Sequence, residues 1–345
     1  MIPDALMERI RQAPEEGLVL ASRVRLARNL EGHPFWETDT LAGQEQTYLE
    51  LEAFRSQHFP DLELVADSSC RQETLSLLVE RLELPQPLRL RSGASWAAYQ
   101  EVSGARGMLL NDEDHLRLWS QRTGCDLLGC LEDLSDWEET LRDHLTLARD
   151  ARWGWKTWSP SALGSGLQAG VLLFLPALRW TRRIESTRNA LEAMGFLLQP
   201  VLDSDADTAL LAVANRMSLG ITEAELAARL EELVGRLVAE EHRALDDLTQ
   251  QQELELRDGV ARAEALLAAS RLMTRSEMLR RLELCAMGSR LGWLPANRAR
   301  LAVLLHLVTG NAHLEGLAGA VSREALPSLD DLRAGAVAKA WLARE

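Results

Sequence analysis

The chain of 345 residues has a net charge of −14 and an apolar fraction of 46%, as is ordinary for a soluble globular protein with a large core. Its negative charge argues against general binding to nucleic acid or to anionic membranes, because like charges repel. The four cysteines form no C-x-x-C pair and the histidines show no ligand spacing, so we expect no metal site. No signal-peptide pattern opens the chain, and the longest apolar run, residues 170–178, is too short to span a bilayer. We therefore expect a cytoplasmic protein.

Alternating polar and apolar residues predict strands in the first part of the chain. Residues 18–25 place Leu20 and Val24 on one face and Arg23 and Arg25 on the other. The alternation recurs over residues 108–119, where it would place Glu113, His115 and Arg117 together on one strand face. Further strands are predicted at residues 170–175, 195–202 and 208–214, and a helix at 135–148.

The period changes to 3.6 residues after Gly220, which predicts helices to the end of the chain. Thr222 and Glu225 have the spacing of a capping box, and a leucine stripe follows them. We predict an α+β domain over residues 1–248 and an all-helical domain over residues 249–345. The polar residues 249–252 mark the boundary, and the alternative is that they lie inside one long helix.

Three segments carry residues suited to phosphate chemistry. Arg23 and Arg25, two positions apart on a strand, would present parallel guanidinium groups to successive phosphates of a nucleotide. Glu113 beside Arg117 combines a carboxylate that could orient and deprotonate a guanidinium with a cation for phosphate. The glycines of residues 163–166 allow close approach of backbone to an anion. Taken singly, the charged pairs are more typical of solvated surfaces, and the glycines are more typical of a tight turn.

Trp153, Trp155 and Trp158 stand close together before this glycine-rich segment. A tryptophan cluster can anchor a partner or stack on a purine. Ordinary packing is the other interpretation, since two of them alternate on a predicted strand.

Together, Ser22-Arg23-Val24-Arg25-Leu26-Ala27-Arg28-Asn29, the segment Asn111 to Arg117 and the loop of residues 158–168 resemble the ATP:guanidino phosphotransferases. The resemblance is strongest to the bacterial protein arginine kinases and covers almost the whole chain. It implies an antiparallel sheet flanked by helices, followed by a helical C-terminal domain. It also implies transfer of the γ-phosphoryl group of ATP, bound with Mg²⁺, to protein arginine. Arg23, Arg25 and Arg117 match the family's nucleotide-phosphate arginines, and Glu113 matches its guanidinium-binding carboxylate.

The chain departs from the family pattern at several reactive positions. Ser159 replaces a cysteine, and Gln168 and Gln199 each replace an arginine, while Ser204 replaces a second glutamate. A transition-state arginine is worth roughly 10³–10⁵ in rate, and a positioned general base about 10²–10⁴. These losses predict a pseudokinase that acts as a scaffold or regulator in proteostasis. The alternative is an active protein arginine kinase with a remodelled site.

The resemblance also suggests partners. It implies a protein partner or substrate connected with the stress-response and Clp-protease machinery, and a helical domain that supports a homodimer. No nucleic-acid or membrane partner is expected from the charge of the chain.

Overall fold

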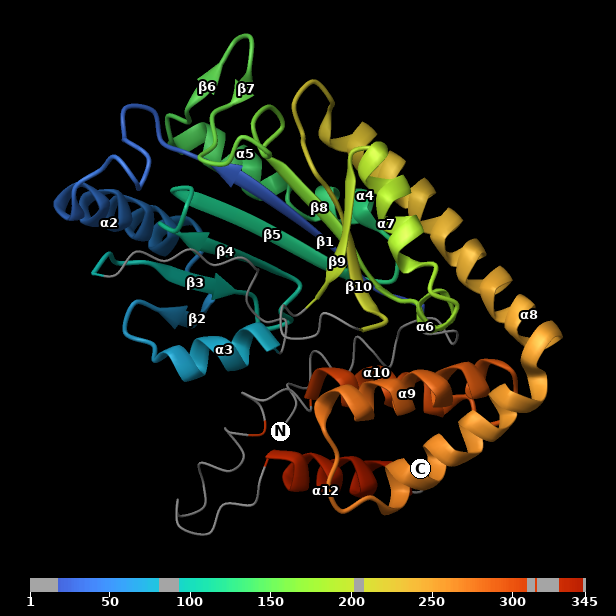
Figure 1. Ribbon diagram of the computed structural model, residues 1–345. Helices are drawn as coiled ribbons and strands as arrows, with labels where there is room; N and C mark the ends of the chain where they lie inside the picture. The colour runs from blue at the N-terminus through green and yellow to red at the C-terminus, as the bar shows by residue number, and fades with distance from the viewer. Residues whose placement is uncertain (1–17, 81–92, 202–207, 309–313, 315–328, 344–345) are drawn as a thin grey trace, which may run out of the picture.

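A computed structural model describes residues 18–80, 93–201, 208–308, 314 and 329–343. A broad sheet with helices around it is followed by a group of helices below it (Figure 1). The strands are β1 (Val19–Arg28), β2 (Glu63–Asp67), β3 (Ala97–Gln100), β4 (Arg106–Leu110), β5 (Leu116–Thr123), β6 (Arg149–Asp150), β7 (Gly154–Trp155), β8 (Leu167–Phe174), β9 (Phe196–Pro200) and β10 (Leu210–Asn215). The helices are α2 (Leu41–His58), α3 (Gln72–Glu80), α4 (Leu127–Asp133), α5 (Ser135–His144), α6 (Pro176–Trp180), α7 (Ile184–Ala193), α8 (Glu223–Ala269), α9 (Arg275–Arg290), α10 (Asn297–Val308) and α12 (Leu329–Leu342).

Eight of the strands form one sheet in the order β2-β3-β4-β5-β1-β8-β10-β9. Every neighbouring pair is antiparallel. The first predicted strand, β1, lies in the middle and pairs with β5 on one side and β8 on the other. The predicted α+β class, with an antiparallel sheet flanked by helices, is confirmed.

One face of this sheet is covered by helices. On β1, Leu20, Val24 and Leu26 point to this covered face and are almost fully buried. Side chains of α2, α4, α5 and α8 join them in the main hydrophobic core. Each fully buried leucine or valine contributes roughly 1.5–3 kcal/mol relative to an exposed one, so this face supplies much of the stability of the fold.

The opposite face is covered over only part of its width. Leu75 and Leu78 of α3 pack with Ala98, Leu109 and Trp119 in a second, smaller cluster above β3, β4 and β5. Over β1, β8, β10 and β9, no helix among the described residues covers this face. We call this part the open face; the strand register places on it Ala21, Arg23, Arg25, Gln168, Gly170, Leu172, Ala212, Ala214, Leu197 and Gln199.

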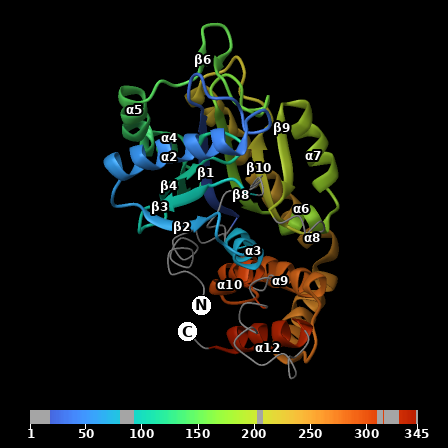
Figure 2. The same ribbon diagram turned by 90° about the vertical axis from the view of Figure 1, so that its left-hand side faces the viewer.

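The second part of the chain is helical, as predicted. The capping box of Thr222 and Glu225 is formed and begins α8, a helix of 47 residues with a kink at Gln252. Helices α9 and α12 pack against α8, and α10 packs against α9 (Figure 2). Gln252, the last residue of the polar segment, has a non-helical backbone (φ −142°, ψ 37°), so α8 consists of two helical stretches that meet there; the division into two domains stays a prediction.

Two buried carboxylates connect these helices to α6 and to the residue that precedes β10. Glu241 of α8 accepts hydrogen bonds from the amides of Ala177 and Leu178 at 2.8 Å each, and it pairs with Arg290 of α9 at 3.0 Å. Glu283 of α9 accepts from the Ala209 amide at 3.0 Å and from Arg179 at 2.6 Å. The two parts are therefore joined by polar contacts as well as by packing.

The prediction of one strand over residues 108–119 is wrong. Strand β4 ends at Leu110 and β5 begins at Leu116, so residues 111–115 form the turn between them. Asn111 has φ 61°, and its side chain donates to the carbonyls of Gln44 and Ser95. Asparagine and aspartate bind nearby backbone and so compete with the strand ladder. The helix predicted at 135–148 also ends earlier, at His144.

Candidate active site

The two arginines of β1 lie side by side on the open face. Across the sheet, Arg25 is directly opposite Gln168 of β8, and Arg23 is opposite Gly170. The neighbouring positions Ala21, Ala212 and Ala214 carry small side chains, so the surface around the arginines is shallow. A flat ligand with several anionic groups could therefore reach both guanidinium groups from the same side.

Positive charge is concentrated around Arg25. Burial, followed by repulsion from Arg117 and from Arg23, lowers the pKa of Arg25 to about 9. Arg23 also donates to the Gln121 amide oxygen at 2.6 Å, which fixes its position on the sheet. A guanidinium destabilised by neighbouring cations would gain from a bound anion, because the anion offsets that repulsion.

Arg117 of β5 joins this cluster and is held by two carboxylates. Its Nη2 lies 3.2 Å from Asp112 Oδ2 and 3.3 Å from Glu113 Oε2. All three residues are buried. Burial opposes the charge of Arg117, but Asp112, Asp114 and Glu113 together raise its pKa above the ordinary value. Burial also raises the pKa of the Asp112 carboxyl to about 6. The predicted pair of Glu113 and Arg117 is thus formed, although Glu113 lies in the turn.

The buried carboxylate of Asp114 connects this turn with the loop that follows β7. Its Oδ1 accepts from Asn29 Nδ2 at 2.7 Å and from the backbone amide of Trp158 at 2.8 Å. The end of β1, the turn with Glu113 and the segment before Ser159 are therefore held together at one point. Ser159 hydroxyl lies 2.7 Å from that of Ser161.

The same loop continues into β8 through a position that needs glycine. Gly166 has φ 72°, and a Cβ there would lie 2.3 Å from Arg28 Nη1 and 2.8 Å from the Ala27 carbonyl oxygen. Both the backbone conformation and the space exclude a larger residue. Residues 158–166 are consequently packed against the end of β1, beside the arginine cluster.

Comparison with known proteins agrees with this geometry. Residues 91–244 match the model of the ATP:guanido phosphotransferase C-terminal catalytic domain. The chain is 28% identical over 334 residues to the protein-arginine kinase of Halothermothrix orenii, covering 96% of this chain and 95% of that relative. It is also 28% identical over 313 residues to the protein-arginine kinase of Shouchella clausii, covering 88% of this chain and 86% of the relative.

Residues 91–244 therefore resemble the catalytic domain of the ATP:guanido phosphotransferases, and nearly the whole chain is similar to protein-arginine kinases. Solved structures of similar fold include the duplicated taurocyamine kinase of Schistosoma mansoni, with a TM-score of 0.60 at 19% identity. That match covers 79% of this chain but 40% of the taurocyamine kinase, so the present chain spans less than half of it. Lombricine kinase matches with a TM-score of 0.54 at 17% identity, over 68% of this chain and 70% of that one.

Two positions that depart from the family pattern lie on the same face of the sheet as the arginines that match it. Gln168 lies opposite Arg25, and Gln199 of the edge strand β9 lies on the same face at an exposed position. Two positions expected to be cationic are therefore neutral here. Ser204 lies outside the described residues. Of the sequence-predicted residues, the structure brings together Arg23, Arg25, Arg117, Glu113 and Gln168.

Two residues near the cluster were not predicted. Asp112 is the second carboxylate on Arg117, and Gln121 holds Arg23. Asp112 could have been found from the sequence, because it stands beside Glu113 in the family motif. Gln121 could not, because its place beside Arg23 depends on the pairing of β1 with β5.

The three tryptophans of the predicted cluster differ in how far they are exposed. Trp155 is buried, with Arg28 stacked on its ring at 4.5 Å. Trp158 packs on Trp36 at 5.8 Å between ring centroids, whereas Trp153 is exposed. Among the described residues, no group of three or more His, Cys, Asp or Glu side chains could hold a metal, and no helix has the length and apolarity to cross a membrane.

Proposed function

We propose that this protein transfers the γ-phosphoryl group of ATP to the guanidinium of arginine in a protein substrate. The observation that carries this proposal is the cluster formed by Arg23 and Arg25 on the open face and Arg117 of the adjoining strand β5, next to the carboxylate of Glu113. Matches over nearly the whole chain to relatives named protein-arginine kinase support the choice of acceptor.

The three arginines would hold the phosphates of the nucleotide. Repulsion from Arg117 and Arg23 destabilises the charged form of Arg25, so phosphate oxygens placed between them would relieve that repulsion. Mg²⁺ would enter with ATP, since it usually binds through phosphate oxygens, water and only one or two carboxylates. When bound, it would neutralise charge on the phosphates.

Glu113 would orient the arginine that accepts the phosphoryl group. A guanidinium nitrogen attacks the γ-phosphorus, the bond from that phosphorus to the β–γ bridging oxygen breaks, and ADP leaves. The proton lost by the guanidinium passes to the carboxylate of Glu113. Asp112 would keep Arg117 in place meanwhile, because it contacts the same Nη2 atom.

The neutral residues at two positions would make this reaction slow. Gln168 and Gln199 can donate hydrogen bonds but supply no charge to the transition state. Since one such arginine is worth roughly 10³–10⁵ in rate, and losses within one site are not additive, we expect turnover several orders of magnitude below the usual value of about 1–100 s⁻¹.

The Clp-protease connection, the homodimer and the cytoplasmic location implied earlier stay predictions.

A second candidate function is a nucleotide-binding pseudokinase that acts as a scaffold or regulator in proteostasis. The observation that favours it is the neutral Gln168 directly opposite Arg25, at a position where the family carries an arginine. Such a protein would bind Mg-ATP through the remaining arginines without completing transfer.

Calorimetry and phosphoarginine detection together test the proposal. The full chain is titrated with Mg-ATP and then incubated with Mg-ATP and β-casein, and phosphoarginine is measured by mass spectrometry at neutral pH. We expect saturable binding and slow phosphoarginine formation that Glu113→Gln abolishes. The matched control Glu139→Gln, at an exposed position of α5, should behave as wild type. Binding without phosphoarginine would favour the second candidate, and absence of binding would contradict both.

A further inference from the structure

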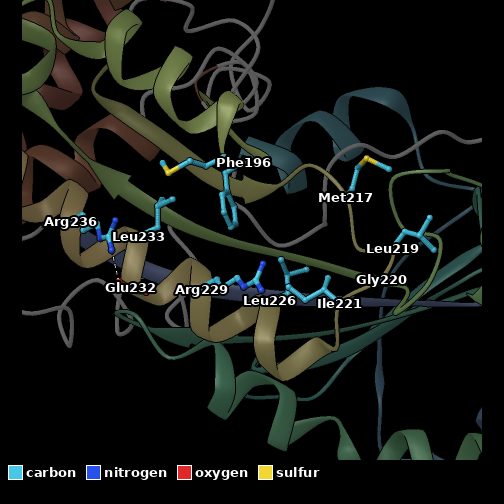
Figure 3. Close-up of a pocket in the computed structure, with 12 residues that line it drawn as sticks. Phe196, Met217, Leu219, Gly220, Ile221, Leu226, Arg229, Glu232, Leu233 and Arg236 are labelled. Carbon is cyan, nitrogen blue, oxygen red and sulfur yellow. Dashed lines mark hydrogen bonds and ion pairs between the residues drawn. The ribbon is translucent and has the colours of Figure 1, made fainter.

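A cavity of about 450 Å³ lies on the covered side of the sheet, between the start of β9, residues 216–221 and the first turns of α8. Its apolar walls include Met194, Phe196, Met217, Leu219, Leu226 and Leu233. Phe196 points from its strand toward α8, and Leu226 and Leu233 come from the helix (Figure 3). The volume is within the range of small-molecule sites, roughly 300–1,000 Å³.

The lip of this cavity exposes large apolar side chains. Met194 is 52% exposed, Met217 53% and Leu219 38%. Exposed apolar side chains that gather around a cavity, unlike scattered ones, mark sites of interaction. Methionine is also flexible and polarisable, so two methionines at the lip could adapt to a ligand's apolar body.

The polar part of the wall is mainly cationic. Arg229 and Arg236 follow Leu226 and Leu233 on α8 by three residues each, which places both guanidinium groups along the apolar wall. The one lining carboxylate, Glu232, is already paired with Arg236. On a chain with a net charge of −14, an apolar cavity bordered by two arginines favours an anionic ligand.

The lip is hydrogen-bonded to the loop of the candidate active site. Ser218, which is fully buried, donates its amide to Ser161 oxygen at 3.0 Å and its hydroxyl to Leu163 oxygen at 3.2 Å. Asn215 donates to the carbonyls of Leu167 and Met217, at 3.0 and 3.3 Å. A ligand that moves this lip would therefore displace residues next to Ser159 and Gln168.

We propose that this cavity is a binding site for an apolar carboxylate, with its chain against the leucine and methionine side chains and its carboxylate at Arg229 and Arg236. The proposal does not rest on phosphoryl transfer, because the cavity lies on the other side of the sheet from the arginine cluster.

Calorimetric titration of the full chain with sodium decanoate, below its micelle concentration, tests the proposal. The cationic probe decyltrimethylammonium has a similar chain and the opposite charge. We expect saturable one-to-one binding of decanoate and clearly weaker binding of the cation. Loss of two rim charges in Arg229→Gln/Arg236→Gln should weaken decanoate binding about fivefold to tenfold. Met217→Glu should abolish it, by placing a carboxylate at the lip.

The matched control is Arg243→Gln, a similarly exposed arginine on the same helix that does not line the cavity. It should bind decanoate as wild type does. Absence of saturable decanoate binding, equal binding of both probes, or unchanged affinity in the double variant would each overturn the proposal. Circular dichroism of every variant establishes that a loss of binding is not a loss of folding.

Discussion

The two faces of the central sheet differ in what their side chains do. On the covered face of β1 and β8, Val24, Val171 and Leu173 are fully buried in the main core. On the open face of the same two strands, Arg23, Arg25 and Gln168 keep partly exposed side chains. Because successive residues of a strand point to opposite sides, one segment serves both packing and chemistry.

Stability and phosphate chemistry therefore depend on alternate residues of the same strands. The covered face gains from apolar burial, whereas the open face concentrates cations that repel one another. Such a cluster of cations destabilises the folded state until an anion binds. Substitutions on the two faces should therefore have opposite consequences.

The largest expected effect is on activity, from Arg25→Gln on the open face. Phosphoarginine formation should fall about 10³-fold, because a guanidinium that contacts the transferring phosphates is lost. Unfolding temperature should stay equal or rise, because the substitution removes a charge that neighbouring cations repel and whose pKa is lowered in the folded state. Activity and thermal unfolding are measured beside Arg262→Gln, an exposed control on α8. A folded, fully active Arg25→Gln protein would refute the role of the open face.

The converse change is Leu173→Ala on the covered face. It should lower the unfolding free energy by about 2–5 kcal/mol, because it leaves a cavity in the core around a fully buried side chain. Denaturant unfolding compares it with Leu172→Ala, the adjacent, partly buried position on the open face. The neighbouring substitution should cost less than half as much. Equal costs would show that the two faces do not differ in their contribution to stability.

A third prediction concerns pH and Asp112. Burial raises the pKa of this carboxyl from 3.8 to about 6, so between those values the folded protein retains a proton that the unfolded chain releases. This group's contribution to stability is therefore present below about pH 4 and is lost as pH rises to about 6. Relative to Asp112→Asn, wild type should lose on the order of 3 kcal/mol between pH 4 and pH 7.

Urea unfolding at several pH values measures this difference. Asp258→Asn, which removes an exposed carboxylate on α8, is the control and should leave the pH dependence of wild type unchanged. A wild-type advantage that grew with pH would mean that the ion pair with Arg117, rather than burial, dominates the ionisation of Asp112.

The smallest effect expected is a gain of activity in Gln168→Arg. This substitution restores a cation opposite Arg25, at the position where the family has an arginine. We expect phosphoarginine formation to increase about tenfold, less than a full arginine effect because Gln199 remains neutral. Gln251→Arg, at an exposed position of α8, controls for the added charge. No increase, with binding of Mg-ATP intact, would favour the pseudokinase.

Much of the fold could be predicted because its signals are local. The alternation in β1, the apolar run in β8 and the capping box of Thr222 are properties of neighbouring residues, and the structure confirms them. The turn at residues 111–115 was missed because the alternation at the start of β5 was extended back over five consecutive polar residues. Its Asn-Asp composition, which favours local hydrogen bonds over a ladder, was the better signal.

The arrangement of the site could be predicted only in part. The motifs identified Arg23, Arg25, Arg117 and Glu113, and the structure brings them together. The position of Gln168 opposite Arg25 follows from the register of β1 and β8, which local sequence does not determine. The link through Asp114 joins segments far apart in the chain and likewise depends on the completed fold.

The most direct test of the central claim is a crystal structure of the full chain grown with Mg-ADP. We expect the nucleotide to lie on the open face, with its phosphates in contact with Arg23, Arg25 and Arg117 and with Gln168 beside them. A nucleotide bound elsewhere, or phosphates that leave these three arginines without contact, would contradict it.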